Sequence, residues 1–154
     1  MCSAVSLPLS ELPLHLHASI TGRILGRGGD PEVRFHLNAV PAFLPVWWGG
    51  KLQLLRWGNR DRSERRLPPS AWTWRETLES GKWADLPTER VDIPARFLFV
   101  NGVWTMCKEG VRGLLVRTPS DDLPVVYLIC QPATRYWEVM TRAKWMPVLI
   151  GEII

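Results

Sequence analysis

Short apolar stretches, each ended by Gly, Pro or Asn, recur along the chain and predict a β-rich fold with few helices. Residues 43–48 and 51–57 flank Gly49-Gly50, and this spacing predicts a hairpin closed by a two-residue turn. Residues 125–130 form a near-continuous apolar run, which is typical of a strand buried on both faces.

A second hairpin is predicted where residues 97–100 and 103–106 flank Asn101-Gly102, the strongest short turn signal in the chain. Residues 111–117 follow a Lys-Glu-Gly turn, so we expect them to extend this hairpin into a meander. Neighbours in sequence are therefore expected to be neighbours in the sheet.

Two helices complete the predicted elements. Ser70 can cap a helix over residues 71–80 that ends at Gly81, where a glycine suits the position after the last turn. A second helix is expected over residues 133–142. The pattern as a whole predicts a β-rich domain with two or three short helices.

Composition narrows the functional classes. With 154 residues, the chain has room for one domain, which we place over residues 1–154. The formal net charge is +4, 15 of the 19 cationic residues are Arg, and nine residues are Trp. Guanidinium groups and indoles in these numbers favour a surface that binds anions and stacks against flat rings.

Cysteine usage indicates the compartment. Cys2, Cys107 and Cys130 form no CxxC pair, so neither a disulfide framework nor a zinc site is predicted. No apolar run approaches the roughly 20 residues that cross a bilayer, and no basic leader precedes an apolar segment. We therefore expect a cytoplasmic protein with no membrane partner.

Two further patterns are set aside. His15 and His17 alternate without a third ligand nearby, so we expect solvated or core histidines and not a metal site. The glycine-rich residues 26–29 lack the spacing of a phosphate-binding loop and are expected to form a surface turn. No metal or cofactor is predicted.

Cys2 offers a specific chemistry. Removal of Met1 would give one residue both an α-amine and a thiol on adjacent carbons. These two groups condense with an aldehyde, because the amine forms an imine and the thiol then closes a five-membered thiazolidine. Cys107 and Cys130 are expected to be ordinary core thiols.

Several short motifs then follow Cys2 in a recognisable order. They are Arg34-Phe35-His36-Leu37-Asn38, Arg56-Trp57-Gly58, Arg75-Glu76-Thr77, Arg90-Val91-Asp92-Ile93-Pro94-Ala95 and Met146-Pro147-Val148-Leu149-Ile150. This order resembles the SRAP family (SOS response-associated peptidase-like proteins), whose members begin MCGR and carry RYNIAP-like, RWGLIP, NARxET, RCLIPAxGFYEW and HxRMPVIL stretches. The resemblance covers nearly the whole chain.

The resemblance implies a fold and an activity. Such proteins are compact α+β domains of two curved antiparallel sheets, with the active cysteine in a basic groove. They bind single-stranded DNA, and the N-terminal cysteine forms a thiazolidine with the ring-opened aldehyde of an abasic site, which gives a DNA–protein cross-link. The family is also thought to remove its own initiator Met. No cofactor is implied.

The departures from the family pattern fall on its functional positions. Trp72 stands at the position of the Asn in NARxET, Val100 near that of the Glu, and Ala143 at that of the His, so only Cys2 is retained. Loss of a proton-transferring group typically costs about 10²–10⁴-fold in rate. The chain also ends just after the MPVIL motif, where relatives continue, and is interpreted as a shortened, degenerate member.

Three hypotheses remain open. In the first, Cys2 still cross-links slowly to abasic single-stranded DNA. In the second, the chain is a catalytically inactive nucleic-acid-binding module, with tryptophans that stack on bases and arginines that contact phosphates. The residues assigned to DNA binding are Arg34, Arg56, Trp57, Arg60, Arg62, Arg65, Arg66, Trp72, Trp74 and Arg75. In the third, it is a protein-interaction module, phage-related, with an unspecified partner. The alternative without a binding function is that the tryptophans fill the hydrophobic core. The basic loop predicted over residues 56–69, which we call the Arg-rich loop, would then only be exposed to water.

Overall fold

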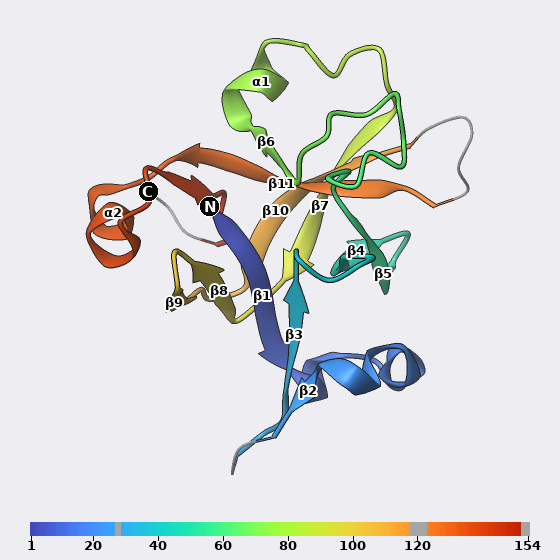
Figure 1. Cartoon of the computed structure of the whole chain (residues 1–154), viewed down its shortest axis with the longest axis vertical. Helices are drawn as coiled ribbons and strands as arrows, with labels where there is room; N and C mark the ends of the chain where they lie inside the picture. Colours follow the sequence, from blue (N-terminus) through green and yellow to red (C-terminus); the bar gives the residue numbers. More distant parts are fainter. Residues whose placement is uncertain (27–28, 118–122, 152–154) are drawn as a thin grey trace.

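Two β-sheets and a few short helices make up the part of the chain that the computed structural model describes, residues 1–26, 29–117 and 123–151 (Figure 1). The first sheet has five strands in the order β2-β3-β1-β8-β9. They are β1 (Cys2–Pro8), β2 (Ile24–Leu25), β3 (Glu32–His36), β8 (Phe97–Val100) and β9 (Val103–Met106). The predicted β-rich α+β class is confirmed.

The second sheet is larger, and part of it closes into a ring of strands. Its strands are β4 (Phe43–Trp48), β5 (Lys51–Trp57), β6 (Trp72–Trp74), β7 (Thr88–Pro94), β10 (Gly110–Val116), β11 (Val125–Pro132) and β12 (Trp145–Pro147). The order is β10-β7-β4-β5-β11-β12, and β10 also pairs with β11, so five strands form a closed ring. Closure removes unpaired strand edges from the middle of the molecule.

Strand β11 is the most connected strand of the second sheet. It runs antiparallel to β10 and β12 and parallel to β5 and β6. Every residue from Val125 to Gln131 is buried, which confirms the strand predicted from the apolar run. Alternate side chains enter different cores: Leu128 and Cys130 belong to the main hydrophobic cluster, whereas Tyr127 and Ile129 belong to a second one.

Both predicted hairpins are confirmed. Strands β4 and β5 pair antiparallel around the two-glycine turn, and β8 and β9 pair around Asn101-Gly102. Asn101 has φ 49° and Gly102 has φ 80°. Both values are left-handed, as the turn that best matches the twist of two hairpin strands requires.

The predicted meander is wrong. Strand β10 does not continue the sheet from β9; it pairs with β7 over seven positions, from Gly110 opposite Pro94 to Val116 opposite Thr88. On its other side it pairs with β11. Strand β9 has only four residues, two of them exposed, and so offers a shorter and less buried ladder than β7 and β11 do.

Short helices join these strands. They are η1 (Leu9–Glu11) and η2 (Leu14–Arg23), both of the 3-10 type, and α1 (Arg75–Glu79) and α2 (Arg135–Thr141). The second predicted helix is confirmed as α2, whose first turn is capped by the Thr134 hydroxyl, which accepts a 3.2 Å hydrogen bond from the Trp137 backbone N–H.

The first helix was predicted to begin at residue 71, which is too early in the chain. Residues 72–74 form β6 because they pair with the buried β11, and α1 starts only at Arg75. Ser70 is not its cap; the Ser70 hydroxyl donates to the Trp72 carbonyl. The backbone pairing with β11 therefore overrides the local capping signal.

Helix η2 was not predicted, and it carries both histidines of the alternating pair. No group of three potential metal ligands occurs within the described ranges. Nor does any helix in those ranges have the length and apolar character to cross a membrane. Of the glycine-rich turn expected at residues 26–29, Arg27 and Gly28 lie outside the described residues.

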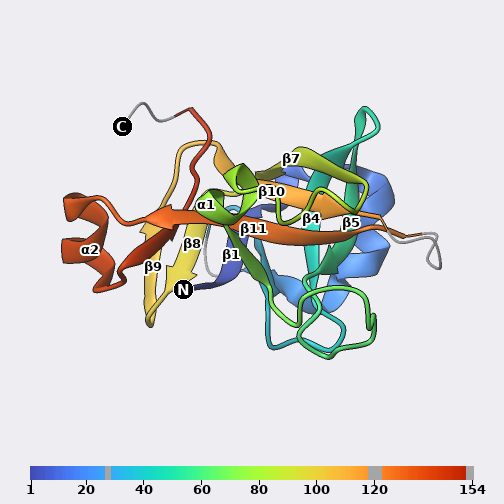
Figure 2. The same cartoon turned by 90° about the horizontal axis from the view of Figure 1, so that it is seen from above.

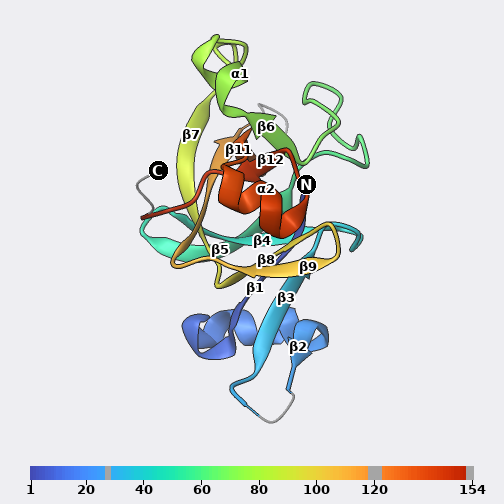
Figure 3. The ribbon, with the colours of Figure 1, turned by 90° about the vertical axis from the view of Figure 1, so that its left-hand side faces the viewer.

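The arrangement in space brings the chain start to the last described strand. The N-terminus lies beside β12, although the two are distant in sequence (Figures 1 and 3). Helix α1 and the η2 segment lie at opposite ends of the long axis (Figure 1), and α1 lies over β11 when the molecule is seen from above (Figure 2).

Gly58, which follows β5, provides a test of this packing. It has φ +67°, and a Cβ there would lie 2.5 Å from the Ser70 carbonyl oxygen and 2.6 Å from the Ala71 Cα. We expect Gly58→Ala to lower the free energy of unfolding by more than about 3 kcal/mol, because a steric clash adds to the left-handed backbone cost.

Gly50→Ala is the matched control. Gly50 has a similar φ of +78°, but nothing lies within 4 Å of its virtual Cβ. This variant should lose only about 1–2 kcal/mol, the backbone cost alone. Equal losses for both variants in urea unfolding would contradict the close approach of residues 58 and 70–71.

Candidate functional site

Cys2 begins β1 and is enclosed on all sides. The residue is 1% exposed, and its thiol donates a hydrogen bond to the Ala4 carbonyl at 3.4 Å. Strand β1 lies between β3 and β8, and Cys2 is directly opposite Val100 on β8. The register shifts between Cys2 and Ala4, so the first residue of the strand is placed by a local irregularity of the sheet.

Two of the three positions that the motifs match to the family's functional residues lie at this point. The Trp72 indole N–H donates to the Cys2 carbonyl at 2.9 Å, and Val100 is the strand partner of Cys2. Ala143 is 6% exposed and belongs to the same hydrophobic cluster as Cys2 and Val100. Residues from β6, β8 and the turn before β12 therefore share one core with the start of β1.

This surrounding is apolar, and it suppresses thiol ionisation. Burial is the main cause that raises the pKa of the Cys2 thiol to about 12, and the hydrogen bond to the Ala4 backbone only partly offsets it. Burial likewise raises the pKa of Cys130. Since the thiolate is the nucleophile, Cys2 is poorly prepared for attack at neutral pH. While Met1 precedes it, the Cys2 nitrogen is also a peptide nitrogen and cannot form an imine.

Beside Cys2, two tryptophans stack across β11. Trp74 on β6 is opposite Cys130, and Trp145 on β12 is opposite Pro132. The two ring centroids are 4.8 Å apart with an interplanar angle of 32°. Trp145 remains 38% exposed. Together with half-buried Trp72, these residues form what we call the tryptophan cluster (Trp72, Trp74 and Trp145).

Trp145 is a site residue that the sequence analysis did not assign to binding. It stands where the family's HxRMPVIL motif has its Arg, and by the same counting Trp74 stands where NARxET has its Arg. The signal was thus present in the motifs, as an indole at two separate places where the family pattern has a cation. Only the fold shows that the two indoles are in contact.

Cationic side chains lie close to Trp145 in sequence and are exposed. Arg135 opens α2, Arg142 ends it with φ 60°, and Lys144 immediately precedes Trp145. All three are exposed. Within the described ranges, none of the three forms an ion pair with a carboxylate. Their charge is therefore available to an anionic partner.

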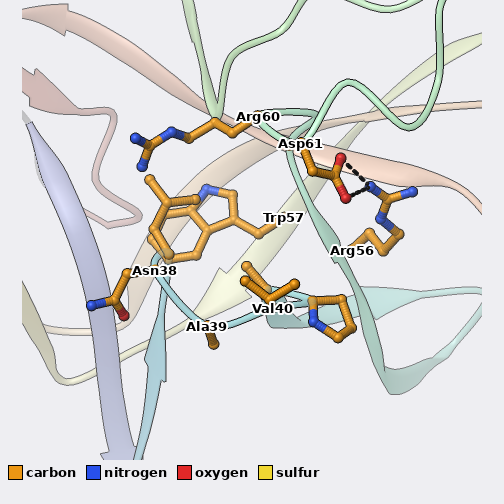
Figure 4. A pocket seen from close by; sticks show the side chains of 11 residues that line it. Asn38, Ala39, Val40, Arg56, Trp57, Arg60 and Asp61 are labelled. Carbon is orange, nitrogen blue, oxygen red and sulfur yellow. Dashed lines mark hydrogen bonds and ion pairs between the residues drawn. The ribbon is translucent and has the colours of Figure 1, made fainter.

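The predicted Arg-rich loop is only partly a free cationic surface. Arg56 lies on β5 and forms a 2.9 Å ion pair with Asp61. The hydrogen bond from the Ser63 backbone N–H is the main cause that lowers the pKa of Asp61 below its usual range. Arg56 lowers this pKa by less. Asp61 and Arg60 line a cavity of about 280 Å³ (Figure 4). The carboxylate makes this cavity a poor place for a phosphate.

The remaining arginines of that loop, Arg62, Arg65 and Arg66, are exposed. Buried Asn59 shapes the loop, because its amide donates to the carbonyls of Glu64 and Leu67 at 2.6 and 3.0 Å. The loop therefore has a defined backbone, and it holds these three arginines on the outside.

Two other predicted binding residues have structural roles. Trp57 is 2% exposed and donates its indole N–H to the Ala71 carbonyl at 3.2 Å, so the prediction that it stacks on a base is wrong. Arg34 forms an ion pair with Glu32 on the same strand and lies over the Trp104 ring at 4.7 Å. It belongs to the first sheet, whereas the tryptophan cluster is built on the second.

No protein-family model matches the chain, and no curated protein or solved structure does so either. The functional assignment therefore depends on the chain's own residues and geometry.

The raised pKa of Cys2 predicts slow alkylation. With a pKa of about 12 instead of 9.0, the thiolate is about a thousandfold rarer at pH 8 than in an open cysteine. We expect iodoacetamide at pH 8 to modify none of the three cysteines rapidly in the folded protein, since all are buried, and all three in urea. Rapid modification of Cys2 in the native state, located by peptide mass spectrometry, would contradict the buried site.

Proposed function

We propose that the chain is an SRAP-related domain that binds single-stranded DNA without covalent chemistry, through the tryptophan cluster and the cations beside it. The observation that carries the proposal is the Trp74–Trp145 pair, stacked at 4.8 Å with Trp145 38% exposed. An exposed indole already held in place offers a base a stacking surface at little further cost in side-chain entropy.

The relationship to SRAP proteins is supported by a spatial coincidence. Trp72, Val100 and Ala143 are far apart in sequence and were matched to functional positions from short motifs alone. Two of them contact or pair with Cys2, and the third shares its buried cluster. A chance resemblance of motifs gives no reason for Trp72 and Val100 to meet at Cys2.

The absence of a covalent step follows from the chemistry of the same residues. An imine and thiazolidine need a free amine and a reactive thiol, and groups that transfer protons accelerate their formation, whereas Trp, Val and Ala transfer none. Two lost groups at about 10²–10⁴-fold each would reduce the rate by about 10⁴-fold or more. Burial of the Cys2 thiol reduces it further.

Single strands are favoured over duplexes by the nature of the surface. The flat faces of bases are accessible in a single strand and stacked inside a duplex, and stacking on an aromatic side chain is worth about 1–3 kcal/mol per base. Exposed Arg135, Arg142 and Lys144 would contact the phosphates. Phosphate contacts make such binding depend on salt concentration.

Substitution of Trp145 tests the binding surface. We expect Trp145→Ala to weaken binding of an oligothymidylate about 5- to 150-fold, which corresponds to the loss of about 1–3 kcal/mol of stacking. Fluorescence anisotropy of a labelled oligonucleotide measures the affinity. If three phosphates are neutralised, a plot of log affinity against log salt concentration should have a slope of about −2.

Trp47→Ala is the matched control, because Trp47 is 50% exposed on β4 and lies outside the tryptophan cluster. It should leave the affinity within about twofold. Equal weakening by both variants, or no salt-dependent binding of the unsubstituted protein, would refute the proposed surface.

Abasic DNA distinguishes this proposal from the covalent alternative. We expect protein with Met1 removed, confirmed by intact mass, to give no cross-linked band with an abasic single strand on a denaturing gel within an hour. Cys2→Ala should bind the same strand as tightly as the unsubstituted protein does, because the thiol does not face the surface. A retarded band that disappears in Cys2→Ala would establish the covalent activity instead.

A further inference from the structure

Three arginines line one pocket on the other side of β11 from the tryptophan cluster. Arg75 comes from α1, Arg90 from β7 and Arg112 from β10. The pocket has a volume of about 350 Å³, and its other lining residues are Leu78, Ile129, Gln131, Val148, Leu149 and Gly151. None of the lining residues is acidic, in contrast to the cavity beside Asp61.

The position of this pocket is set by the alternation of side chains along β6 and β11. Trp72 and Trp74 face the main core, whereas Thr73 accepts a 3.0 Å hydrogen bond from Trp83 of the second core. On β11, Ile129 and Gln131 point to the side opposite Cys130. Hence the pocket and the tryptophan cluster lie on opposite faces of the second sheet.

One of the three guanidinium groups is held by a buried amide. Gln131 is 8% exposed, and its side-chain oxygen accepts a 3.1 Å hydrogen bond from Arg75 Nη1. Arg75 Nε is also 3.5 Å from Glu79 Oε1. A cation whose orientation is maintained by a buried partner has less conformational freedom to lose when a ligand binds.

Donor capacity remains on all three arginines. A guanidinium carries five N–H donors. The ion pair of Arg112 with Asp92 uses Nη1 at 3.0 Å, and Arg90 forms no ion pair with any described residue. The two pairs are about half exposed and therefore weak. Glu109 is the other nearby carboxylate, beside the Gly151 backbone.

We infer that this pocket is a binding site for a phosphate group. Guanidinium groups match phosphate oxygens in geometry and charge. Arg90 supplies a positive charge that no carboxylate of the described residues pairs, and Arg75 and Arg112 add N–H donors that their ion pairs leave unused. The apolar residues Leu78, Ile129 and Val148 on the pocket wall suit a phosphate attached to an organic group. The phosphate comes either from a small phosphorylated compound or from a nucleic-acid backbone that continues around the domain.

Isothermal titration with inorganic pyrophosphate tests the site directly. We expect saturable 1:1 binding that Arg90→Gln weakens at least about tenfold. Arg90→Gln breaks no ion pair of the described structure, so its folding should be unaffected, as a thermal unfolding curve can verify. Arg112→Gln should weaken pyrophosphate binding to a similar extent. It should also leave folding intact, because the exposed ion pair with Asp92 adds little stability.

Arg117→Gln is the matched control, because Arg117 follows the same strand as Arg112 but lies over the Trp48 ring, outside the pocket. It should change pyrophosphate affinity less than twofold. Equal weakening by Arg117→Gln would show diffuse charge attraction and overturn the site, as would the lack of any saturable binding at millimolar pyrophosphate.

Two further measurements identify the source of the phosphate. If Arg90→Gln also weakens binding of an oligothymidylate without terminal phosphates, the ligand is a nucleic-acid backbone; if it weakens only pyrophosphate, the ligand is a small phosphorylated compound. Trp145→Ala should retain pyrophosphate binding in full, so this site and the proposed DNA-binding surface can fail independently.

Discussion

Backbone pairing along β11 is the constraint on which both candidate surfaces depend. The C-terminal half of this strand holds β6 on one side and β12 on the other, so the rings of Trp74 and Trp145 meet although some seventy positions separate them. Burial of residues 125–131 makes this pairing obligatory, because unsatisfied backbone groups in the interior would cost several kcal/mol each. The strand therefore positions the Trp74–Trp145 stack and, on its other face, Gln131 beneath Arg75.

The surroundings of Cys2 are apolar or aromatic at the three positions that the motif resemblance matches to polar functional groups. Trp72, Val100 and Ala143 occupy these positions. They pack without leaving a buried acid or base unpaired, whereas a single Glu or His there would carry a large desolvation cost in such a core. These three residues therefore give Cys2 no group that transfers a proton.

Indoles and cations lie on different elements of the domain. On the proposed function, the indoles of Trp74 and Trp145 would offer flat faces to bases, and the cations would attract phosphates. Cationic charge is found on α2 and its C-terminal end, and in the pocket of Arg75, Arg90 and Arg112. In this arrangement ring stacking and charge attraction are supplied by different elements, which allows either to be altered separately by substitution.

Local patterns in the sequence were enough for those features that local physics controls. The two hairpins, the buried strand at residues 125–130 and helix α2 are confirmed, because turn residues, apolar runs and a capping Thr act over a few positions. The attachment of β10 to β7, the strand at residues 72–74 and the core position of Trp57 were decided by long-range pairing. No short window of sequence contains the partner of such a strand. For the same reason, Cys2 was identifiable from sequence as a candidate, but its burial beside Trp72 and Val100, and the contact of Trp74 with Trp145, exist only in the tertiary structure, where strands far apart in sequence are paired.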